Sequence, residues 1–484
     1  MAENSIMLHG GALTAELTAQ ITNGTVHILN GGWGGAVTSL FTDSRAVTGD
    51  SMFVCISGEN FDGHNYAASA VTSGARIILA ERVPDGEIST GVDVVIVDDT
   101  IKALGRLAGY YIKESGAETI AVTGSVGKTT TKEFIASCFA VKHRVHKTEG
   151  NKNNEIGLPL TALSMEADTE YAVFECGMSG MHEIEYLSRI VKPDVAVITN
   201  IGTAHIEKLG SRENIAKAKL EIVSGMDPVT GVLIINADEP LLYEVKDSLP
   251  VGKVITAAQH NREADFRAVN LRRTGNGMVF DLIYMGKVAT NIEIPTIGVH
   301  NVYDALYAFA AGIVCGLSEA EIRAGLKSFR GVAMRQKIYE LAGFTVIEDC
   351  YNASPESMRA SIDVLMSVAK EKGGRAAALL GDMRELGEYS RLLHEQLGVY
   401  AARAGLQLLF TYGAIAENIA TAAISNGVRA ENVYVNVDCG NPAPTGDMVL
   451  GALEAGDVLL VKASRAVAAE AVLEYIKQKV SDRT

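Results

Sequence analysis

The chain has 484 residues, a length that favours several domains, most simply three, each large enough to bury its own core. Apolar residues make up 48% of the chain and charged residues 21%, which excludes a globally disordered protein. The formal net charge of -15 argues against a general nucleic-acid surface, because neutralising a phosphate backbone takes clustered lysine and arginine.

The expected location follows from three further features. The amino-terminal segment has no basic stretch followed by a long apolar one, and no apolar run is long enough to cross a bilayer. The six cysteines lie far apart and form no CxxC pair, which is typical of free thiols in a reducing compartment. We therefore expect a cytoplasmic protein with no transmembrane segment and no nucleic-acid partner.

The predicted elements indicate an α/β protein. Short apolar runs between residues 38 and 99 alternate with turns and helical stretches, which predicts a small α/β domain. Buried-strand patterns at 118–123, 171–176, 194–201 and 231–238, with helical segments between them, predict a central domain with a mostly parallel sheet. Four strand and helix pairs after residue 330 resemble a dinucleotide-binding fold in their order. We expect domains over residues 1–114, 115–331 and 332–484.

The segment AVTGSVGKTTTKE at 121–133 is a candidate phosphate-binding loop. Gly124 and Gly127 let the backbone turn so that successive amides face phosphate oxygens at the positive end of the next helix. Lys128 adds a charge, and Thr129 would place its hydroxyl on a magnesium ion. The general G-x-x-x-x-G-K-[ST] pattern is not matched, because Val122 stands at its first glycine, so a glycine turn with a solvated lysine is the alternative. The other expected nucleotide contacts in this loop are Ser125, Val126 and Thr130.

Longer strings resemble the Mur ligase family. TGSVGKTTTKE is followed by KTEGNKNNEIGLPLT, and six more stretches keep the family's order over nearly the whole chain: ECG at 175–177, TNIGTAHIEKLGSRENIAKAKLEI at 199–222, GVHNVYDALYA at 298–308, EDCYNASPESM at 348–358, LGDMRELGEYS at 380–390 and LVKASRA at 460–466. The resemblance implies an ATP-dependent ligase that joins D-alanyl-D-alanine to UDP-N-acetylmuramoyl-tripeptide through an acyl phosphate. It also implies an amino-terminal domain for the UDP-sugar, a central ATPase with a phosphate loop, and a carboxy-terminal domain that closes over ATP and brings the amine.

Three residues are candidates for a centre of two magnesium ions. Glu175 ends a buried strand, where open parallel sheets collect ligands, and by resemblance it binds magnesium; a capping glutamate is the alternative. His205 has the same topological place and by resemblance binds the second ion as a neutral imidazole, although a lone histidine here is more often structural. Lys219 as an ammonium would be repelled by the metals. The resemblance implies a carbamate made from carbon dioxide, against the alternative of a solvated helix lysine.

The remaining site residues follow from the resemblance. Asn301 would contact the adenine, Arg335 the ATP phosphates and Asp349 the ribose, while Asn301 as a helix cap is the alternative. Tyr351 and Asn352 would line the ATP and dipeptide side of the cleft. Contacts to the UDP-muramoyl-peptide are expected from two turn-rich regions, each of which alone reads as an ordinary turn: Ser44, Arg45, Asp62, Gly63 and His64, and then Asn151, Asn153 and Asn154.

Two other functions fit parts of the pattern. A sister ligase that adds a single amino acid shares the phosphate loop, but NKNNEIGLPLT and DCYNASP argue against it. A non-catalytic nucleotide switch would not need Glu175, His205 and Lys219 together. The expected active form is a monomer.

Overall fold

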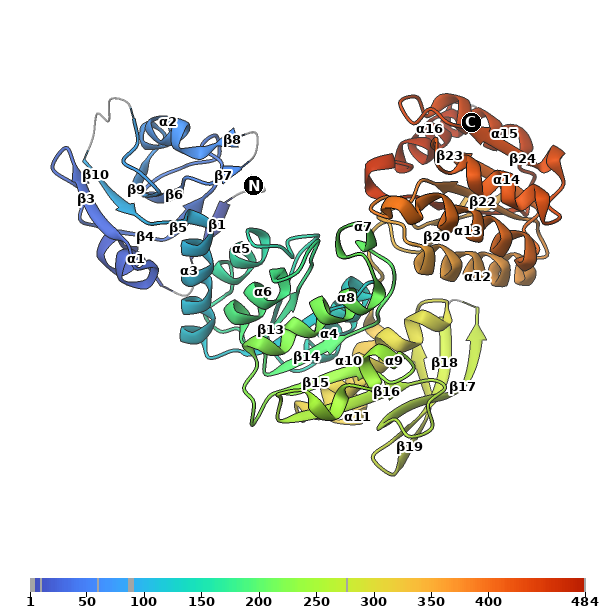
Figure 1. Ribbon diagram of the computed structural model, residues 1–484, viewed down its shortest axis with the longest axis horizontal. Helices are drawn as coiled ribbons and strands as arrows, with labels where there is room; N and C mark the ends of the chain where they lie inside the picture. Colours follow the sequence, from blue (N-terminus) through green and yellow to red (C-terminus); the bar gives the residue numbers. More distant parts are fainter. Residues whose placement is uncertain (1–4, 9–10, 59–60, 86–90, 276, 483–484) are drawn as a thin grey trace.

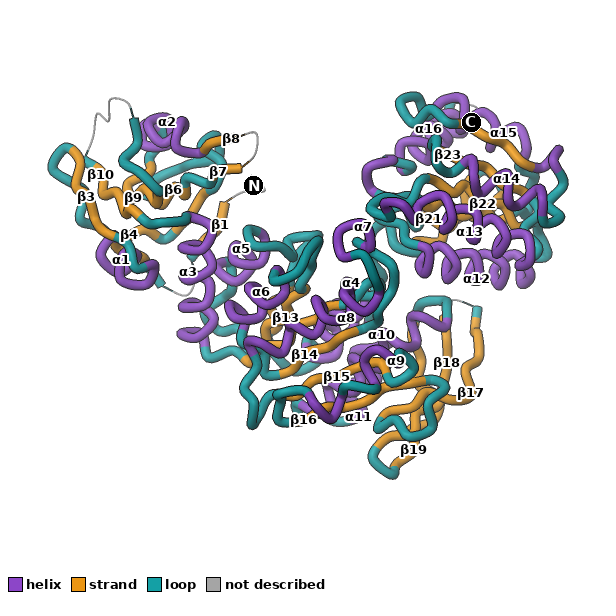
Figure 2. Tube along the Cα trace, viewed as in Figure 1, coloured by secondary structure: helices purple, strands orange, loops and turns teal. Residues whose placement is uncertain are grey.

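The computed structural model describes residues 5–8, 11–58, 61–85, 91–275 and 277–482. They form three α/β lobes in chain order, and the central lobe lies between the other two (Figure 1). In each lobe, helices flank a β-sheet (Figure 2). The expected α/β class is confirmed.

The amino-terminal lobe contains a six-stranded sheet in the order β1-β5-β6-β9-β10-β3. Its four middle strands are parallel, and β1 and β3 pair antiparallel at the edges. Phe53, Ile78 and Val94 in the middle strands are fully buried, as expected for parallel strands covered on both faces. The elements are β1 (Ser5–Met7), β2 (Leu13–Thr14), α1 (Ala15–Thr22), β3 (Thr25–Leu29), β4 (Ala36–Val37), β5 (Ser39–Phe41), β6 (Ser51–Val54), β7 (Ser57–Gly58), β8 (Phe61–Asp62), η1 (Gly63–Tyr66), α2 (Ala67–Thr72), β9 (Ala75–Ala80) and β10 (Val92–Ile96).

A single helix, α3 (Thr100–Ser115), leads from this lobe to the central one. The Asp99 side chain caps its first turn, and Gly116, with φ 66°, ends it in the left-handed region. The helix packs against α1 on one side and against α5 (Gly157–Leu163) and α6 (Glu183–Val191) of the central lobe on the other. The two lobes therefore share one continuous buried apolar cluster.

The central lobe contains a nine-stranded sheet in the order β12-β13-β11-β14-β15-β16-β17-β18-β19. The strands from β12 to β17 pair in parallel, which confirms the expected mostly parallel sheet. Its elements are β11 (Glu118–Thr123), α4 (Lys128–Phe139), β12 (Val145–Lys147), β13 (Tyr171–Glu175), β14 (Val195–Ile198), α7 (Ile206–Leu209), α8 (Arg212–Leu220), η2 (Glu221–Gly225), β15 (Val232–Asn236), α9 (Pro240–Tyr243), η3 (Lys246–Ser248), β16 (Lys253–Ala258), β17 (Phe266–Thr274), β18 (Gly277–Tyr284), β19 (Lys287–Ile294), α10 (Val299–Val314) and α11 (Glu319–Ser328).

The antiparallel strands β17, β18 and β19 extend this sheet beyond what the sequence analysis predicted. Their residues alternate between buried and exposed positions, the pattern of a sheet with one face toward solvent. Register shifts between Val269 and Arg272 and between Phe280 and Leu282 interrupt the alternation. Such bulges weaken the strand signal in the sequence.

The carboxy-terminal lobe has a six-stranded sheet in the order β20-β21-β25-β22-β23-β24, parallel except for β20 at one edge. The last strand, β25, returns to the middle of the sheet and brings LVKASRA beside the start of the lobe. The elements are β20 (Lys337–Leu341), β21 (Phe344–Glu348), α12 (Pro355–Lys372), β22 (Ala376–Gly381), η4 (Gly387–Tyr389), α13 (Ser390–Ala404), β23 (Leu408–Tyr412), α14 (Glu417–Ser425), η5 (Ala430–Asn432), β24 (Val433–Asn436), α15 (Ala443–Ala452), β25 (Val458–Lys462), η6 (Arg465–Val467) and α16 (Glu470–Ser481).

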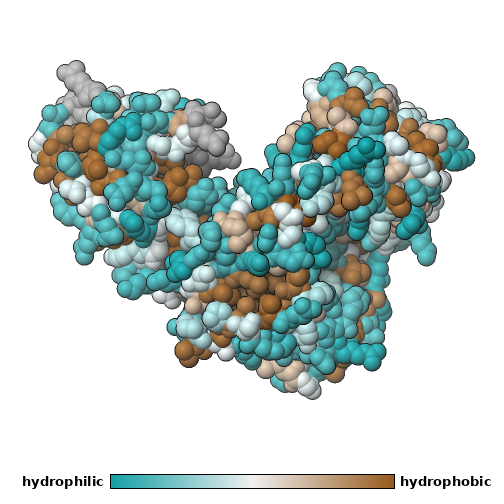
Figure 3. Space-filling model, viewed as in Figure 1, coloured by the Kyte–Doolittle hydropathy of each residue, from teal (hydrophilic) through white to brown (hydrophobic). Residues whose placement is uncertain are grey.

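The surface in Figure 3 is mostly hydrophilic, with apolar residues in separate patches. None of the described helices combines the length and the apolar composition needed to span a membrane.

Candidate active site

Two cavities lie at the junction of the central and carboxy-terminal lobes. The larger, of about 1810 Å³, is lined by the glycine turn after β11, the asparagine-rich turn before α5 and residues of the carboxy-terminal lobe. The smaller, of about 650 Å³, shares Gly127, His300 and Asp304 with it. This is the carboxyl end of the parallel strands β11, β13 and β14, where open α/β sheets bind ligands.

The glycine turn between β11 and α4 depends on its two glycines. Gly124 has φ 147° and Gly127 has φ 86°, conformations that side chains rarely adopt. A Cβ atom on Gly124 would lie 1.8 Å from Thr199 Oγ1, and one on Gly127 would lie 2.4 Å from Asp304 Oδ1. The turn delivers the free amides at the start of α4 to the cavity, the arrangement that binds anions.

Neighbouring loops hold the turn in place. Asn200 Oδ1 accepts a hydrogen bond from Val126 N at 3.0 Å, and Asn200 Nδ2 donates to Val126 O at 3.0 Å. Ser125 N donates to the carbonyl of Asn200 at 3.2 Å, and Ser125 Oγ accepts from Gly202 N at 2.8 Å. These four hydrogen bonds fix the conformation of the turn.

Lys128 lies across the turn, and its Nζ donates to Gly124 O at 2.8 Å. Burial lowers the pKa of Lys128, the Glu175 carboxylate opposes that shift, and Arg335 adds to it. The two cations thus lie close enough to act on one anionic group.

A buried carboxyl group, Asp304 of α10, lies behind the turn. It is 4% exposed, and its Oδ1 accepts a hydrogen bond from Thr131 Oγ1 at 3.0 Å. Burial raises the pKa of Asp304 to about 8, although Thr131 and Arg335 favour the ionised form. The group is therefore mostly protonated at neutral pH.

This shift predicts a pH-dependent change in stability for Asp304→Asn. A carboxyl group with a raised folded-state pKa stabilises the fold at low pH, and that contribution is lost as the pH rises from about 4 to about 8. The variant cannot ionise, so at pH 9 we expect it to exceed the wild type in free energy of unfolding by about 1 kcal/mol or more. Urea unfolding from pH 5 to pH 9 measures this. Asp247→Asn, at a side chain 89% exposed, should follow the wild type, and the same result for Asp304→Asn would contradict the prediction.

Glu175 ends β13 and is 2% exposed. Its Oε2 accepts from Thr129 Oγ1 at 2.8 Å, and its Oε1 accepts from Asn153 Nδ2 at 2.9 Å. Among the described residues its one ion-pair partner is Lys132, whose Nζ lies 3.9 Å from Oε2. Glu175 is therefore a buried carboxylate whose ion-pair partner lies no closer than 3.9 Å, and such a group can take up a further cation.

His205 immediately precedes α7 and has a left-handed backbone, with φ 64°. Its side chain is 23% exposed, and its Nδ1 forms an ion pair with Oε2 of Glu385 from the carboxy-terminal lobe. His205 and Glu175 both line the larger cavity.

Lys219 of α8 is 1% exposed, whereas Lys217 two positions earlier is exposed. No described residue forms a hydrogen bond or an ion pair with the Lys219 amine. Burial lowers the pKa of Lys219 well below its usual value, and repulsion from Lys128 lowers it further. Lys219 is absent from the described lining of both cavities, but it lies close enough to Lys128 for their charges to interact. The alternative of a solvated helix lysine is wrong.

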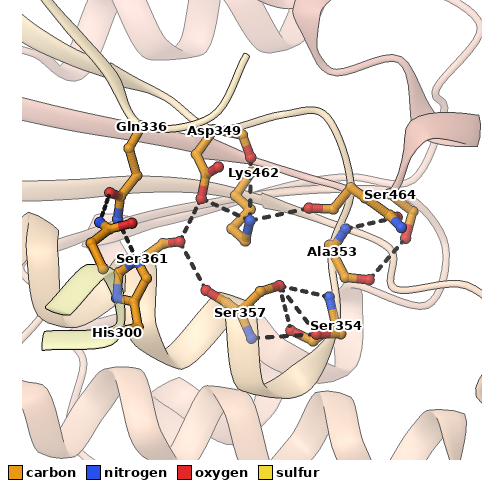
Figure 4. Close-up of polar contacts among 11 residues, drawn as sticks. His300, Gln336, Asp349, Ala353, Ser354, Ser357, Ser361, Lys462 and Ser464 are labelled. Atoms are coloured by element: carbon orange, nitrogen blue, oxygen red, sulfur yellow. Dashed lines mark hydrogen bonds and ion pairs between the residues drawn. The ribbon is translucent and has the colours of Figure 1, made fainter. Parts of the chain in front are cut away.

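The carboxy-terminal lobe brings two charged groups to the larger cavity. The Arg335 guanidinium lies 4.5 Å from the centre of the Tyr351 ring. Asp349 Oδ2 accepts from Lys462 Nζ at 2.7 Å and from Ser361 Oγ at 2.6 Å, as Figure 4 shows. Lys462 also donates to the carbonyl of Asn352 at 3.1 Å. One buried lysine therefore holds both Asp349 and Asn352 in position.

Asn301 is 4% exposed and faces the segment that enters the carboxy-terminal lobe. Its Nδ2 donates to Ile297 O at 2.7 Å and to Gln336 Oε1 at 2.8 Å. Gln336 Nε2 in turn lies 3.1 Å from His300 Nε2 (Figure 4), and burial lowers the pKa of His300 to about 4. The neutral imidazole can therefore accept this hydrogen bond. The adenine role of Asn301 stays a prediction.

The predicted substrate residues Asp62, Gly63 and His64 lie in the amino-terminal lobe. Asp62 accepts from Arg82 at 2.7 Å and from the His64 backbone at 3.0 Å, and these bonds lower its pKa well below its usual value. His64 is 2% exposed. Its Nε2 accepts from the Glu81 amide at 2.9 Å, so its proton lies on Nδ1, 2.6 Å from Asp62. Glu59 and Asn60, which belong to the same turn-rich stretch GENFDGHNY at 58–66, lie outside the described residues.

The other substrate predictions fall on two turns. Arg45 forms an ion pair with Asp43, and its side chain is 88% exposed. In the turn that precedes α5, Asn154 Oδ1 accepts from Gly157 N at 2.8 Å, whereas Asn153 contacts Glu175. Asn151, Asn153 and Asn154 line the larger cavity, but Ser44, Arg45 and Asp62 do not. All these roles stay predictions.

Several polar residues at this junction were not singled out from the sequence. Their residue types and positions inside the quoted family strings were the signals available, but their partners are distant in the chain. They are Lys132, Asn200, Asp304, Glu356, Glu385 and Lys462.

Comparison with known proteins agrees with this geometry. Three family models match in chain order: "Mur ligase family, catalytic domain" over residues 36–111, "Mur ligase middle domain" over 122–312 and "Mur ligase, glutamate ligase domain" over 334–465. A UDP-N-acetylmuramoyl-tripeptide–D-alanyl-D-alanine ligase of Bacillus subtilis is 38% identical, over 90% of this chain and 92% of its own length. The enzyme of the same name from Escherichia coli is 34% identical, over 82% and 86%.

Solved structures are similar over nearly the whole chain. MurF from Acinetobacter baumannii superposes with a TM-score of 0.87 at 30% identity, covering 97% of this chain and 99% of that one. MurF ligase from Thermotoga maritima in complex with ADP has a TM-score of 0.80 at 27% identity, covering 92% and 98%. The three-lobed α/β fold and these matches together establish that the chain belongs to the Mur ligase family.

Proposed function

We propose that this chain joins D-alanyl-D-alanine to UDP-N-acetylmuramoyl-tripeptide, with ATP converted to ADP and phosphate. The observation that carries the proposal is the similarity along nine-tenths of the chain to ligases with that printed name. The product is the UDP-muramoyl-pentapeptide of peptidoglycan synthesis. The reaction draws on ATP and nucleotide-linked precursors, so we infer that it takes place in the cytoplasm.

The proposed reaction has two steps. A carboxylate oxygen of the tripeptide attacks the γ-phosphorus, which forms an acyl phosphate and releases ADP. The amine of the dipeptide then attacks the acyl carbon, phosphate leaves with the C–O bonding pair, and the nitrogen loses a proton. The first step brings two anions together, so cations and amide dipoles at the transferring group must offset their repulsion.

The protein's own groups suit that task. In the proposal, the amides from Gly127 to Thr130 and the Lys128 ammonium hold the phosphates, while Ser125 and Val126 hold the turn in shape through Asn200. Arg335 adds a second cation, which the carboxy-terminal lobe delivers when it docks. Asp349 takes the ribose hydroxyls with the oxygen that Lys462 and Ser361 leave free. Asn301 contacts the adenine.

Magnesium fits the donors present. Thr129, Glu175 and His205 offer hydroxyl, carboxylate and imidazole donors, and the Glu175 carboxylate is buried, with its ion-pair partner Lys132 at 3.9 Å. Within the described part of the chain, no group of three His, Cys, Asp or Glu side chains could hold a metal ion by itself, so phosphate oxygens and a modified Lys219 would complete the proposed two-ion centre. Bound magnesium would offset the negative charge at the transferring phosphate.

A carbamate on Lys219 is the finer part of the cofactor proposal. The neutral amine attacks carbon dioxide, forms a C–N bond and loses a proton, which leaves an anion. A depressed pKa favours the neutral amine that this addition needs. The product would give the buried side chain the anionic charge suited to a metal ligand.

In the proposal, each lobe binds a different substrate or a different part of one. Residues 1–114 would hold the UDP-sugar through Ser44, Arg45 and the segment around Asp62, residues 115–331 the ATP phosphates, and residues 332–484 the dipeptide, with Tyr351 and Asn352 beside it. Asn151, Asn153 and Asn154 would contact the muramoyl-peptide. One chain carries all these residues, so we propose that a monomer suffices.

The direct test is phosphate release from ATP, magnesium and UDP-muramoyl-tripeptide with different amines. We expect turnover with D-alanyl-D-alanine and little with single D-alanine or without an amine. Turnover with a single amino acid on a shorter UDP-muramoyl-peptide, and none with the dipeptide, would instead identify the sister ligase.

Glu175→Ala and His205→Ala should each raise the magnesium requirement and slow turnover by about a hundredfold or more, because each removes a ligand of one charged centre. Their combined effect should be smaller than the product of the two, since both serve one cluster. Rates at varied magnesium for both single variants and the double variant measure this. Small effects that multiply in the double variant would refute a shared centre.

A further inference from the structure

The carboxy-terminal lobe docks on the loop between β14 and α8, which carries His205 at the larger cavity. Figure 1 shows α7 beside that lobe, and α7 contacts η4. Two acids of the carboxy-terminal lobe bind the loop. Glu356 Oε1 accepts from both N and Oγ1 of Thr203 at 2.9 Å, and Glu385 Oε2 contacts His205 Nδ1.

The backbone at the second contact is unusual on both sides. His205 has φ 64° and Glu385 has φ 63°, and neither residue is glycine. Non-glycine residues rarely adopt the left-handed region, so two such residues in contact indicate that the surrounding structure imposes the geometry. Glu207 N also donates to Glu385 O at 3.3 Å, and a Cβ atom on Gly387, with φ 52°, would lie 3.0 Å from Glu207 Cγ.

The contact between Glu385 and His205 bears on which nitrogen of the His205 ring can bind a metal. A carboxylate at Nδ1 favours the proton on that nitrogen and leaves the lone pair of an imidazole on Nε2. Metal-binding histidines commonly donate their other ring N–H to such a carboxylate, which fixes the ring and strengthens the ligand. We propose that Glu385 is a positioning residue, which docks with the carboxy-terminal lobe and orients His205 to bind magnesium through Nε2.

This inference rests on the metal role of His205 in the proposed function and adds a coupling between lobe docking and metal affinity. Docking places Glu385 on His205 and so raises the affinity of His205 for the metal. By linkage, the bound metal must stabilise the docked lobe by the same factor. The metal centre is then complete only when the lobe that brings the amine is in place.

Manganese binding tests the proposal without relying on turnover. The probe is Mn²⁺ with a non-hydrolysable ATP analogue, and the electron paramagnetic resonance signal of free Mn²⁺ gives the dissociation constant. We expect Glu385→Ala to weaken Mn²⁺ binding by about 10- to 100-fold. Glu385→Gln, which keeps the shape but loses the charge, should weaken it less. The matched control Glu388→Ala, at an exposed acid on η4, should bind as the wild type does.

Combining Glu385→Ala with His205→Ala distinguishes a positioning role of Glu385 from general structural damage. In His205→Ala, the further change Glu385→Ala should leave Mn²⁺ affinity unaltered, because its effect passes through the imidazole. Wild-type affinity in Glu385→Ala, or an equal loss in the His205→Ala background, would overturn the proposal. The ligation assay of the wild type is independent: if it joins D-alanyl-D-alanine while Glu385→Ala keeps normal affinity, only the positioning role fails.

Discussion

Lys128→Ala should reduce ATP-dependent ligation by about a thousandfold or more while leaving the fold intact. The ammonium lies inside the glycine turn, 2.8 Å from the Gly124 carbonyl, at the start of the helix whose amides face the cavity. Its loss removes a charge that phosphate transfer needs and leaves no core cavity. Steady-state phosphate release measures the effect, and circular dichroism checks the fold.

Two further variants separate the loss of the Lys128 charge from the loss of side-chain volume and from the general effect of removing a lysine. Lys128→Met keeps most of the side-chain volume and should be as inactive as Lys128→Ala, because the charge is what matters. Lys142→Ala, at a lysine 60% exposed and three residues after the end of α4, should remain active. Near-normal ligation by a folded Lys128→Ala protein would exclude this turn as the phosphate site.

Lys219→Ala should lose nearly all activity, because the proposed carbamate is a ligand that no neighbouring side chain can replace. Small carboxylic acids such as formate should restore part of the rate by filling the vacated position. Removing carbon dioxide from the buffer should lower the rate of the wild type, whereas a cationic lysine would be indifferent to it. Phosphate release under each condition gives the comparison.

Lys217→Ala is the matched control, since it removes an exposed lysine from the same helix and should remain active. The modification itself can be observed by ¹³C NMR with labelled bicarbonate. A carbamate signal is expected in the wild type and in Lys217→Ala, and none in Lys219→Ala. An active wild type without that signal would refute the carbamate.

The sequence predicted the parts of this site that local patterns encode. A buried apolar strand, a glycine turn and a helix predict a phosphate loop within thirteen residues, and the family strings singled out Glu175 and His205, which line the same cavity as that turn. The resemblance singled out Lys219, and the structure buries that lysine while Lys217, two positions earlier, is exposed.

Contacts between distant segments could not be predicted in this way. Asp304 meets Thr131 across 173 positions, and Lys462 meets Asp349 across 113. The ion pair of His205 with Glu385 forms only where two lobes meet, so neither segment alone indicates it. The three antiparallel strands of the central lobe were missed because bulges break their alternation.

The length of the single helix between the first two lobes bears on which substrates can reach the central lobe. With 16 residues, α3 is about 24 Å long, and it packs on the helices next to the asparagine-rich turn. We therefore expect α3 to set the distance between the proposed UDP-sugar residues of the first lobe and the glycine turn. In the proposed function, a substrate bound at the first lobe must reach the turn with its terminal carboxylate, so we expect the length of its peptide to matter. A peptide one residue short is then expected to stop before the γ-phosphate.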